Sequence, residues 1–184
     1  REYMYGAILV PTDGSTAATR ATDGALALAE RFGASVHAVH FVRRDTFPAD
    51  VEDQVTPELV ARGDALVSAI ADSGDDRDVP VRTQVRATTR AIHREIVDYV
   101  ADHDIDLVVM GTHGRTKLNR LILGSIAERT LRRSPVPVLT VHDETVLDAA
   151  FERILVPTDG SGPADAAVDH AIRLAVAADA AIHV

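Results

Sequence analysis

The stretch "ILVPTDGS" occurs twice in this chain of 184 residues, at Ile8–Ser15 and again at Ile154–Ser161. The match continues without gaps: from Ile8 to Ala38, 16 of 31 positions are identical to the position 146 residues later. An agreement of this length at a fixed offset indicates an internal repeat. We therefore expect one full structural unit, followed by the start of a second copy that is cut short at Val184.

Each copy opens with a short apolar run that Pro and Gly end, which is typical of a buried parallel strand. In the first copy a helical pattern follows, which Ser15 or Thr16 can cap and which Gly33 ends. A second apolar run comes after that glycine. The repeated segment therefore predicts a strand–helix–strand unit.

Strands and helices continue to alternate through the rest of the first unit. The predicted strands cover residues 6–14, 34–42, 79–85, 106–110 and 136–141, and the predicted helices cover residues 15–33, 56–74, 88–103 and 125–131. The pair Thr56–Pro57 is typical of a helix start, and Ser125 with Glu128 matches a capping box. Alternating polarity places strand 79–85 near a sheet edge, whereas strand 106–110 is apolar on both faces and therefore belongs inside the sheet.

This order predicts an α/β fold, with a doubly wound five-stranded parallel sheet and helices on both faces. We expect a domain over residues 1–142, a linker over residues 143–152 and the beginning of a second repeat over residues 153–184. Such sheets bind ligands beyond the carboxyl ends of their strands, where the strand order reverses. The loops that follow strands are therefore the places to search for a site.

Composition and charge narrow the class of protein. The chain has no cysteine, which excludes disulfides and thiolate metal sites and fits a cytoplasmic location. No apolar run approaches the roughly 20 residues of a membrane helix, so we expect no membrane insertion. A net charge of −9 argues against nucleic acid as a partner, because like charges repel. Acidic residues with only one lysine are typical both of a halophile and of a GC-rich genome, and both explanations stay open.

The loop after strand 106–110 has the spacing Gly-x2-Gly-x9-Gly-Ser, formed by Gly111, Gly114, Gly124 and Ser125. It matches neither the P-loop nor the dinucleotide-binding fingerprint. Glycines nonetheless let backbone N–H groups converge on an anion, and a helix start attracts phosphate. The alternative is a structural loop in which glycine only permits the turns.

Asp13 follows the first strand, where a doubly wound sheet directs side chains toward the crevice. A carboxylate there accepts hydrogen bonds from ribose hydroxyls or contributes to an Mg²⁺ site. Its alternative role is to cap the following helix, which Asp often does. Because one nucleotide site explains both loops at once, we favour it over two unrelated coincidences.

Three segments together resemble the universal stress protein family: "ILVPTDGS", "VVMGTHGR" at Val108–Arg115, and "LILGSIAERTLRRSPVPVLTV" at Leu121–Val141. The resemblance covers Tyr5–His142. It implies a Rossmann-like fold of the adenine nucleotide alpha hydrolase type, and a role in stress responses. Because this sequence retains the complete glycine motif, the resemblance further implies membership of the ATP-binding subgroup, with ATP as the ligand and Mg²⁺ as its companion.

Carried over by position, the resemblance assigns a role to each part of the site. Pro11, Thr12 and Asp13 would form the ribose or metal side, Phe41 would contact adenine through its backbone, and Met110 would flank the nucleotide. The phosphates would lie against Gly111, Gly114, Gly124, Ser125 and Ile126. Arg115 belongs to the same nucleotide-binding motif, but no chemistry is assigned to it or to His113.

The resemblance also implies a dimer through the last strand, or pairing of the two repeats within one chain. The second copy retains Pro157, Thr158 and Asp159, which correspond to the ribose side alone.

For the function, we favour the hypothesis of a nucleotide-binding regulatory protein. The alternatives are a slow ATPase or phosphotransferase and a nucleotide-sensing domain linked to a transporter. Neither a clear Ser–His–Asp order nor a histidine cluster with metal-ligand spacing is present.

Overall fold

Five parallel strands form one sheet in the order β3-β2-β1-β4-β5. The computed structural model describes residues 4–44, 49–113 and 123–184, and for residues 49–55 it describes the backbone alone. The strands are β1 (Ala7–Pro11), β2 (Ser35–Arg43), β3 (Val81–Thr88), β4 (Leu107–Gly111) and β5 (Val138–Val141), and the helices among them are α1 (Thr16–Phe32), α2 (Ala49–Asp75), α3 (Ile92–Asp102) and α4 (Ser125–Leu131). The predicted α/β fold is confirmed.

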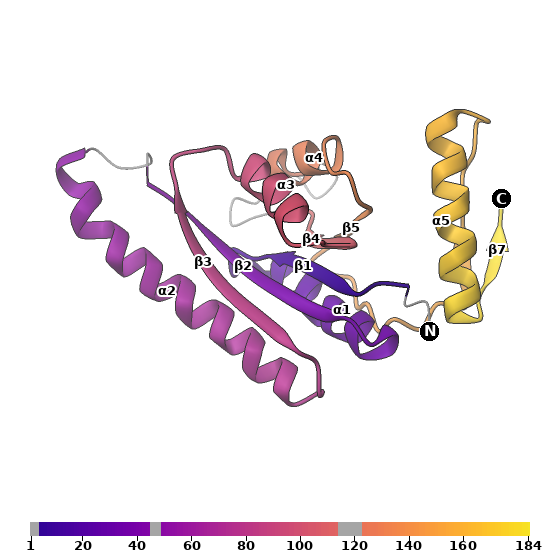
Figure 1. Ribbon diagram of the computed structural model, residues 1–184, viewed down its shortest axis with the longest axis horizontal. Helices are drawn as coiled ribbons and strands as arrows, with labels where there is room; N and C mark the ends of the chain where they lie inside the picture. The colour runs from indigo at the N-terminus through magenta and orange to yellow at the C-terminus, as the bar shows by residue number, and fades with distance from the viewer. Residues whose placement is uncertain (1–3, 45–48, 114–122) are drawn as a thin grey trace. The chain divides into compact units, whose positions relative to one another are not determined.

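Helices cover both faces of the sheet. Helices α1 and α2 lie on one face, and α3 and α4 lie on the other (Figure 1). On the α3 side, Leu9 of the central strand is fully buried with Val39 and Ile96. On the α2 side, Ala38 packs with Val67. Both interfaces are built from small and branched aliphatic side chains, as a chain with few aromatic residues requires.

The predicted places of two strands in the sheet are confirmed. Strand β3 forms one edge, and most of its side chains are exposed or half-buried. Strand β4 lies between β1 and β5 and is buried along most of its length. The strand order reverses between β1 and β4, so the loops that follow these two strands flank the crevice of the sheet.

The start of α2 differs from the prediction. The helix begins at Ala49 rather than at Thr56, so Pro57 lies inside it. An interior proline removes one backbone hydrogen bond and displaces a carbonyl in the preceding turn. Because Pro57 is exposed, water can reach that carbonyl and the helix continues past it. The Thr–Pro pair indicates a helix start only from its immediate neighbours in the sequence, and here the helix begins about two turns earlier.

The remainder of the chain, Ala149–Val184, belongs to a separate compact unit. It contains β6 (Arg153–Leu155), α5 (Gly162–Ala178) and β7 (Ala181–His183), with β6 and β7 paired in parallel. The expected linker, residues 143–152, contains neither helix nor strand. Its first part belongs to the first unit, in which Leu147 packs against Gly24 of α1. None of the described helices has the length and apolar character that crossing a membrane would require.

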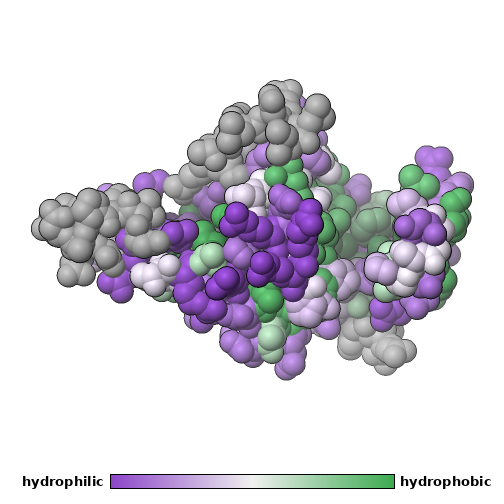
Figure 2. All heavy atoms as spheres, turned by 90° about the horizontal axis from the view of Figure 1, so that it is seen from above, coloured by the Kyte–Doolittle hydropathy of each residue, from purple (hydrophilic) through white to green (hydrophobic). Residues whose placement is uncertain are grey.

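Surface character differs between the two units. Seen from the α3–α4 side, the surface of the first unit is mainly hydrophilic, with smaller apolar areas between the polar residues (Figure 2). In the second unit, large apolar side chains are exposed to solvent, and they belong to Leu155, Ile172, Val176 and Val184. An exposed apolar group of this kind lacks the packing partners that a closed core provides.

Candidate functional site

A cavity of about 570 Å³ lies at the carboxyl ends of β1 and β4, within the first unit. This volume is within the usual range of small-molecule sites, about 300–1,000 Å³. All nine predicted site residues in the described part of the chain line it: Pro11, Thr12, Asp13, Phe41, Met110, Gly111, Gly124, Ser125 and Ile126. Gly114 and Arg115 lie outside the described residues.

One wall of the cavity is apolar. Phe41 and Met110 lie at the ends of β2 and β4, and both are nearly buried. Ile92 and Ile96 complete the wall from α3. The sequence predicted a helix over residues 88–103, but an apolar position on a helix can lie either in a core or in a cavity wall. An apolar surface of this kind suits an aromatic ring system.

The opposite wall is polar and begins at the exit of β1. Asp13 Oδ1 accepts a hydrogen bond from the Ser15 N–H at 2.9 Å, which closes a tight turn around Gly14. Gly14 has a positive φ of 75°, which glycine adopts without strain. Ser15 Oγ accepts from the Ala18 N–H at 3.2 Å, so Ser15 caps α1. The alternative that Asp13 caps this helix is therefore wrong, and its carboxylate borders the cavity.

The residue before Asp13 is held by β2. His40 Nδ1 lies 2.7 Å from the carbonyl oxygen of Thr12, and a carbonyl only accepts, so Nδ1 carries the proton. The Thr12 N–H in turn donates to the carbonyl of Val39 at 2.9 Å. These two bonds fix the turn that presents Asp13.

Gly111 is required for packing within the fold. The sequence suggested only that the glycines of this loop let backbone N–H groups converge on an anion. A Cβ at Gly111 would lie 2.7 Å from the Ala17 carbonyl carbon and 2.8 Å from the Ala18 nitrogen. Real Cβ atoms do not approach backbone so closely, and neither atom can move without shifting α1. Gly111 therefore lets the first turn of α1 pack against the end of β4.

Gly124 joins the other side of the cavity to the exit of β4. Its N–H donates to the carbonyl of Thr112 at 2.7 Å, and a Cβ there would lie 2.9 Å from the same oxygen. Gly124 is also the N-cap of α4, so the predicted capping role of Ser125 is wrong. Ser125 is the first helical residue and makes no side-chain cap bond. Its hydroxyl and the amides of the first helical turn border the cavity.

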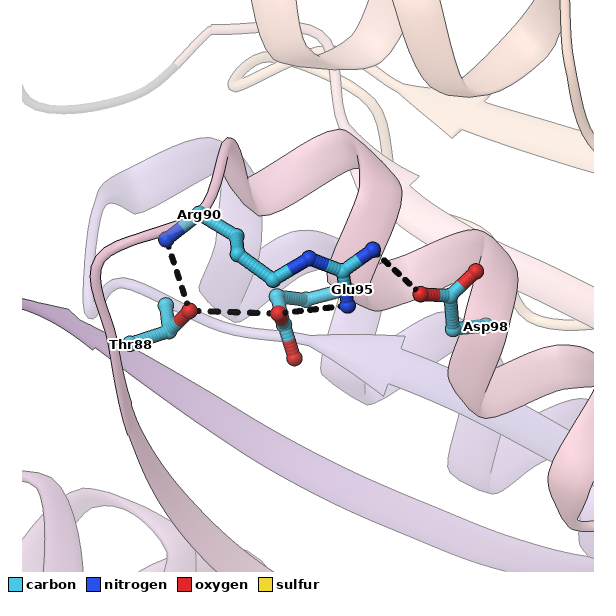
Figure 3. A network of polar contacts seen from close by, with 4 residues as sticks. All are labelled: Thr88, Arg90, Glu95 and Asp98. Atoms are coloured by element: carbon cyan, nitrogen blue, oxygen red, sulfur yellow. Dashed lines mark hydrogen bonds and ion pairs between the residues drawn. The ribbon is translucent and has the colours of Figure 1, made fainter.

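Four polar residues fix the turn between β3 and α3, as Figure 3 shows. Glu95 is buried and accepts from the Thr88 hydroxyl and from the Arg90 guanidinium, both at 3.1 Å. The Arg90 N–H donates to the Thr88 hydroxyl at 2.9 Å, and its guanidinium also pairs with Asp98 at 2.8 Å. Because Ile92 begins α3 directly after this turn, the network positions the apolar wall.

A second polar group lies in the apolar cluster behind that wall. His37 Nδ1 lies 3.0 Å from the Tyr99 hydroxyl, and the Tyr99 ring stacks on His103 at 3.8 Å. Burial lowers the pKa of His37, and the charge of Arg82 and then His103 lower it further. Burial also raises the pKa of the Tyr99 hydroxyl. Both side chains are therefore held in their neutral forms.

The donor set suits a magnesium ion only in combination with a ligand. Among the residues that the structure describes, no group of three metal-ligating side chains comes together. Asp13 is the carboxylate at the β1 exit, and Mg²⁺ is commonly held by one or two carboxylates together with phosphate oxygens. The cavity thus fits an ion that arrives with a phosphorylated ligand.

Comparison with known proteins identifies relatives of this chain by sequence and by fold. The model of the universal stress protein family matches residues 4–142 and 150–184. Universal stress protein MJ0531 of Methanocaldococcus jannaschii is 33% identical over 144 residues, which cover 76% of this chain and 84% of that protein. The solved structure of hypothetical protein MJ0577 matches with a TM-score of 0.69 at 27% identity, and the match covers 77% of this chain and 99% of that one.

A more distant solved structure is that of the universal stress protein from Archaeoglobus fulgidus in complex with dAMP. It matches with a TM-score of 0.54 at 22% identity and covers 75% of this chain and 98% of that one. At this identity the likeness shows a shared fold. The family match and the 33% identical relative together extend over most of the sequence, and the chain belongs to the universal stress protein family.

Proposed function

We propose that this protein binds an adenine nucleotide, ATP foremost, and acts as a nucleotide-dependent regulatory module of the stress response. The observation that carries the proposal is the cavity itself. It joins an apolar wall to a polar wall with a carboxylate and a helix start, at the point where the strand order reverses. Nucleotides combine a flat base, a sugar and a polyanion, which these surfaces match.

In the proposed pose, adenine lies between Phe41 and Met110, with the Phe41 backbone at the edge of the base. Asp13 accepts from the ribose hydroxyls, with Pro11 and Thr12 behind it. The phosphates lie against the backbone of Gly111 and of 124–126, and the Ser125 hydroxyl donates to a phosphate oxygen. The resemblance adds Gly114 and Arg115, which lie outside the described residues. Asp13, together with phosphate oxygens, would hold the Mg²⁺ that accompanies the nucleotide.

Known proteins support the class of ligand. The Archaeoglobus fulgidus protein of the same fold binds dAMP, an adenine nucleotide. The cavity here lies where doubly wound folds bind such ligands. These two facts support the proposal for an adenine nucleotide, and the complete glycine motif extends it to ATP.

We also propose that residues 153–184 begin a second unit of the same type, in a tandem protein. The family model matches residues 150–184 separately, and strand β6 pairs with β7 in the same register as β1 with β2. Association through β5, between chains or between repeats, is part of this proposal, as is a cytoplasmic location.

Isothermal titration with adenosine, AMP and ATP, with and without Mg²⁺, tests the function. We expect ATP to bind and to raise the melting temperature, because a ligand that binds only the native state stabilises it. The variant Ser125→Asp places a negative charge on the phosphate side, at a helix position where Asp is favourable. ATP affinity should therefore fall at least about tenfold, with little change for adenosine and no loss of folding.

The matched control is Gly162→Asp, at the first position of α5, where a Cβ meets no atom within 4 Å. This variant should bind ATP like the unaltered protein. A lack of heat and of thermal shift with ATP at millimolar concentration would contradict nucleotide binding. A single-turnover assay with radiolabelled ATP decides between a switch and an enzyme: phosphate release faster than nucleotide dissociation would favour the ATPase.

A further inference from the structure

We propose that His113 binds the phosphate group of the nucleotide through its Nε2–H, and that Thr112 and His142 select the tautomer that carries this proton. The proposal rests on the proposed function and assigns a phosphate-recognising side chain to the same cavity. It concerns a residue for which the sequence suggested no chemistry.

The position of His113 is fixed from two sides. Its carbonyl oxygen accepts a hydrogen bond from Ser15 Oγ at 3.3 Å, which ties it to the cap of α1. Its ring Nδ1 lies 3.0 Å from the Thr112 hydroxyl. His113 lines the cavity together with Asp13 and Ser125. Backbone and ring are therefore held in place before any ligand arrives.

The second ring nitrogen of His113 has no partner. Its Nε2 is buried and makes no hydrogen bond. Among the described residues that line the cavity, only His113 has a buried side-chain nitrogen or oxygen that makes no hydrogen bond. Buried polar atoms are nearly always satisfied in folded proteins, so an unsatisfied one at a binding cavity calls for a partner. A ligand in the cavity can supply it.

The Thr112 hydroxyl lies between two histidines. It is almost fully buried, and it lies 3.0 Å from His113 Nδ1 and 3.3 Å from His142 Nδ1. A hydroxyl has one proton to donate, so it can donate to only one of the two rings, and the other ring must then donate to it. If Thr112 donates to His113, then His113 carries its proton on Nε2 and His142 carries a proton on Nδ1. If Thr112 donates to His142, the His113 proton lies on Nδ1 instead.

The chemistry of the ligand decides between these arrangements. Phosphate oxygens at neutral pH are mainly acceptors, so only the arrangement with Nε2–H can bind them. A bound nucleotide therefore draws the Thr112 hydroxyl toward His113, and His142 becomes the donor to Thr112. Thr112 and His142 act as positioning residues in this scheme, because Thr112 bonds His113, His142 bonds Thr112, and neither bonds the ligand.

Titrations of AMP and adenosine into three proteins test the contact. In His113→Leu, AMP affinity should fall about 10- to 100-fold, the usual range for a lost hydrogen bond to a charged group, while adenosine affinity changes less than about twofold. In His113→Gln, AMP affinity should be largely retained, because the terminal amide N–H takes the place of Nε2–H. Melting temperatures of both variants report whether they fold.

A spectroscopic test separates recognition from packing. Long-range ¹H–¹⁵N correlation spectra of the histidine rings distinguish the two tautomers. In the unaltered protein, AMP should shift His113 to the Nε2–H form and His142 to the Nδ1–H form. Thr112→Val should abolish the change at His142. Adenosine should leave the tautomer of His113 unchanged.

The outcomes distinguish this proposal from the proposed function. If AMP binds and His113→Leu has no effect, or weakens adenosine and AMP equally, the phosphate contact is wrong and nucleotide binding stands. A bound state with His113 protonated on Nδ1 alone overturns the contact as well. If the unaltered protein binds neither AMP nor ATP, both proposals fail together.

Discussion

The two copies of "ILVPTDGS" have the same local structure and very different surroundings. Each glycine has a φ of 75°, and each aspartate accepts from the serine two residues later, at 2.9 Å for Asp13 and 3.0 Å for Asp159. Each serine caps a helix. Yet Leu9 is fully buried and Leu155 is 76% exposed. The eight residues determine the turn, and other parts of the chain determine whether it borders a cavity.

The difference has a clear physical origin. In the first unit β4 pairs with one side of β1, and α3 packs over Leu9. In the second unit β6 pairs with β7, and the described chain offers no strand on its other side. One face of the second copy is nevertheless packed, since Val156 is buried like Val10. A helix and two strands are therefore enough for the local turn, but not for a closed site.

The largest expected contrast is in the cores of the two copies. Leu9→Ala should lower the free energy of unfolding by about 2–5 kcal/mol, because it leaves a cavity in a packed interior. Leu155→Ala should change it by less than about 0.5 kcal/mol, because Leu155 is mostly exposed. Urea unfolding followed by the signals of Tyr5 and Tyr99, which lie in the first unit, measures the loss for Leu9→Ala, and amide hydrogen exchange in the second unit measures it for Leu155→Ala. Equal losses would show that Leu155 is covered in solution.

The next contrast is in ligand binding. Asp13→Asn retains the turn but removes the negative charge that borders the cavity, so affinity for adenosine and AMP should fall about tenfold or more. Asp159→Asn makes the same chemical change at an exposed turn and should leave affinity unchanged. Calorimetric titration of both variants measures the difference. A loss in Asp159→Asn would mean that the second copy takes part in the site.

The corresponding histidines, His37 and His183, should differ in their effect on pH dependence. The folded state lowers the pKa of His37, so its contribution to stability is complete above pH 6.5 and is lost as the pH falls toward the folded value. One such group changes the free energy of unfolding by at most about 1.4 kcal/mol per pH unit. Urea unfolding of the first unit between pH 5 and 8 should show this slope.

Replacement variants identify the source of that slope. His37→Gln should flatten the decline below pH 6.5, although it lowers stability at neutral pH by disturbing the contact with Tyr99. His183→Gln changes an exposed residue and serves as the control. An unchanged slope in His37→Gln would assign the pH dependence to other groups.

The smallest contrast is at the ends of the two repeated helices. Gly33 ends α1 with φ 71°, whereas Asp179 ends α5 with φ 56°, a conformation that costs a residue with a Cβ some free energy. Asp179→Gly should stabilise α5 by up to about 1 kcal/mol, and Gly33→Ala should destabilise α1 by a similar amount. Amide hydrogen exchange in each helix measures these local effects. Slower exchange in α1 of Gly33→Ala would contradict the argument.

The sequence predicted the order of the elements because strands and helices here have distinct apolar periods. It failed at the start of α2 and at the cap of α4, where the signals at Thr56 and Ser125 are local and longer-range packing prevails. In the site, too, some residues could be predicted from the sequence and others could not. Asp13 could be predicted from the exit of a strand, and Phe41 came from the family resemblance. Ile92 could not be assigned to the cavity, because a core helix has the same pattern.

Gly111 affects how the site can be lost during evolution. Since a methyl group there collides with the backbone of α1, even a relative that binds no ligand must keep glycine at this position to fold. Gly111 alone is thus a poor diagnostic when genomes are surveyed for members that retain binding. Side chains that border the cavity without supporting the fold, such as Ser125, are free to drift and therefore discriminate better.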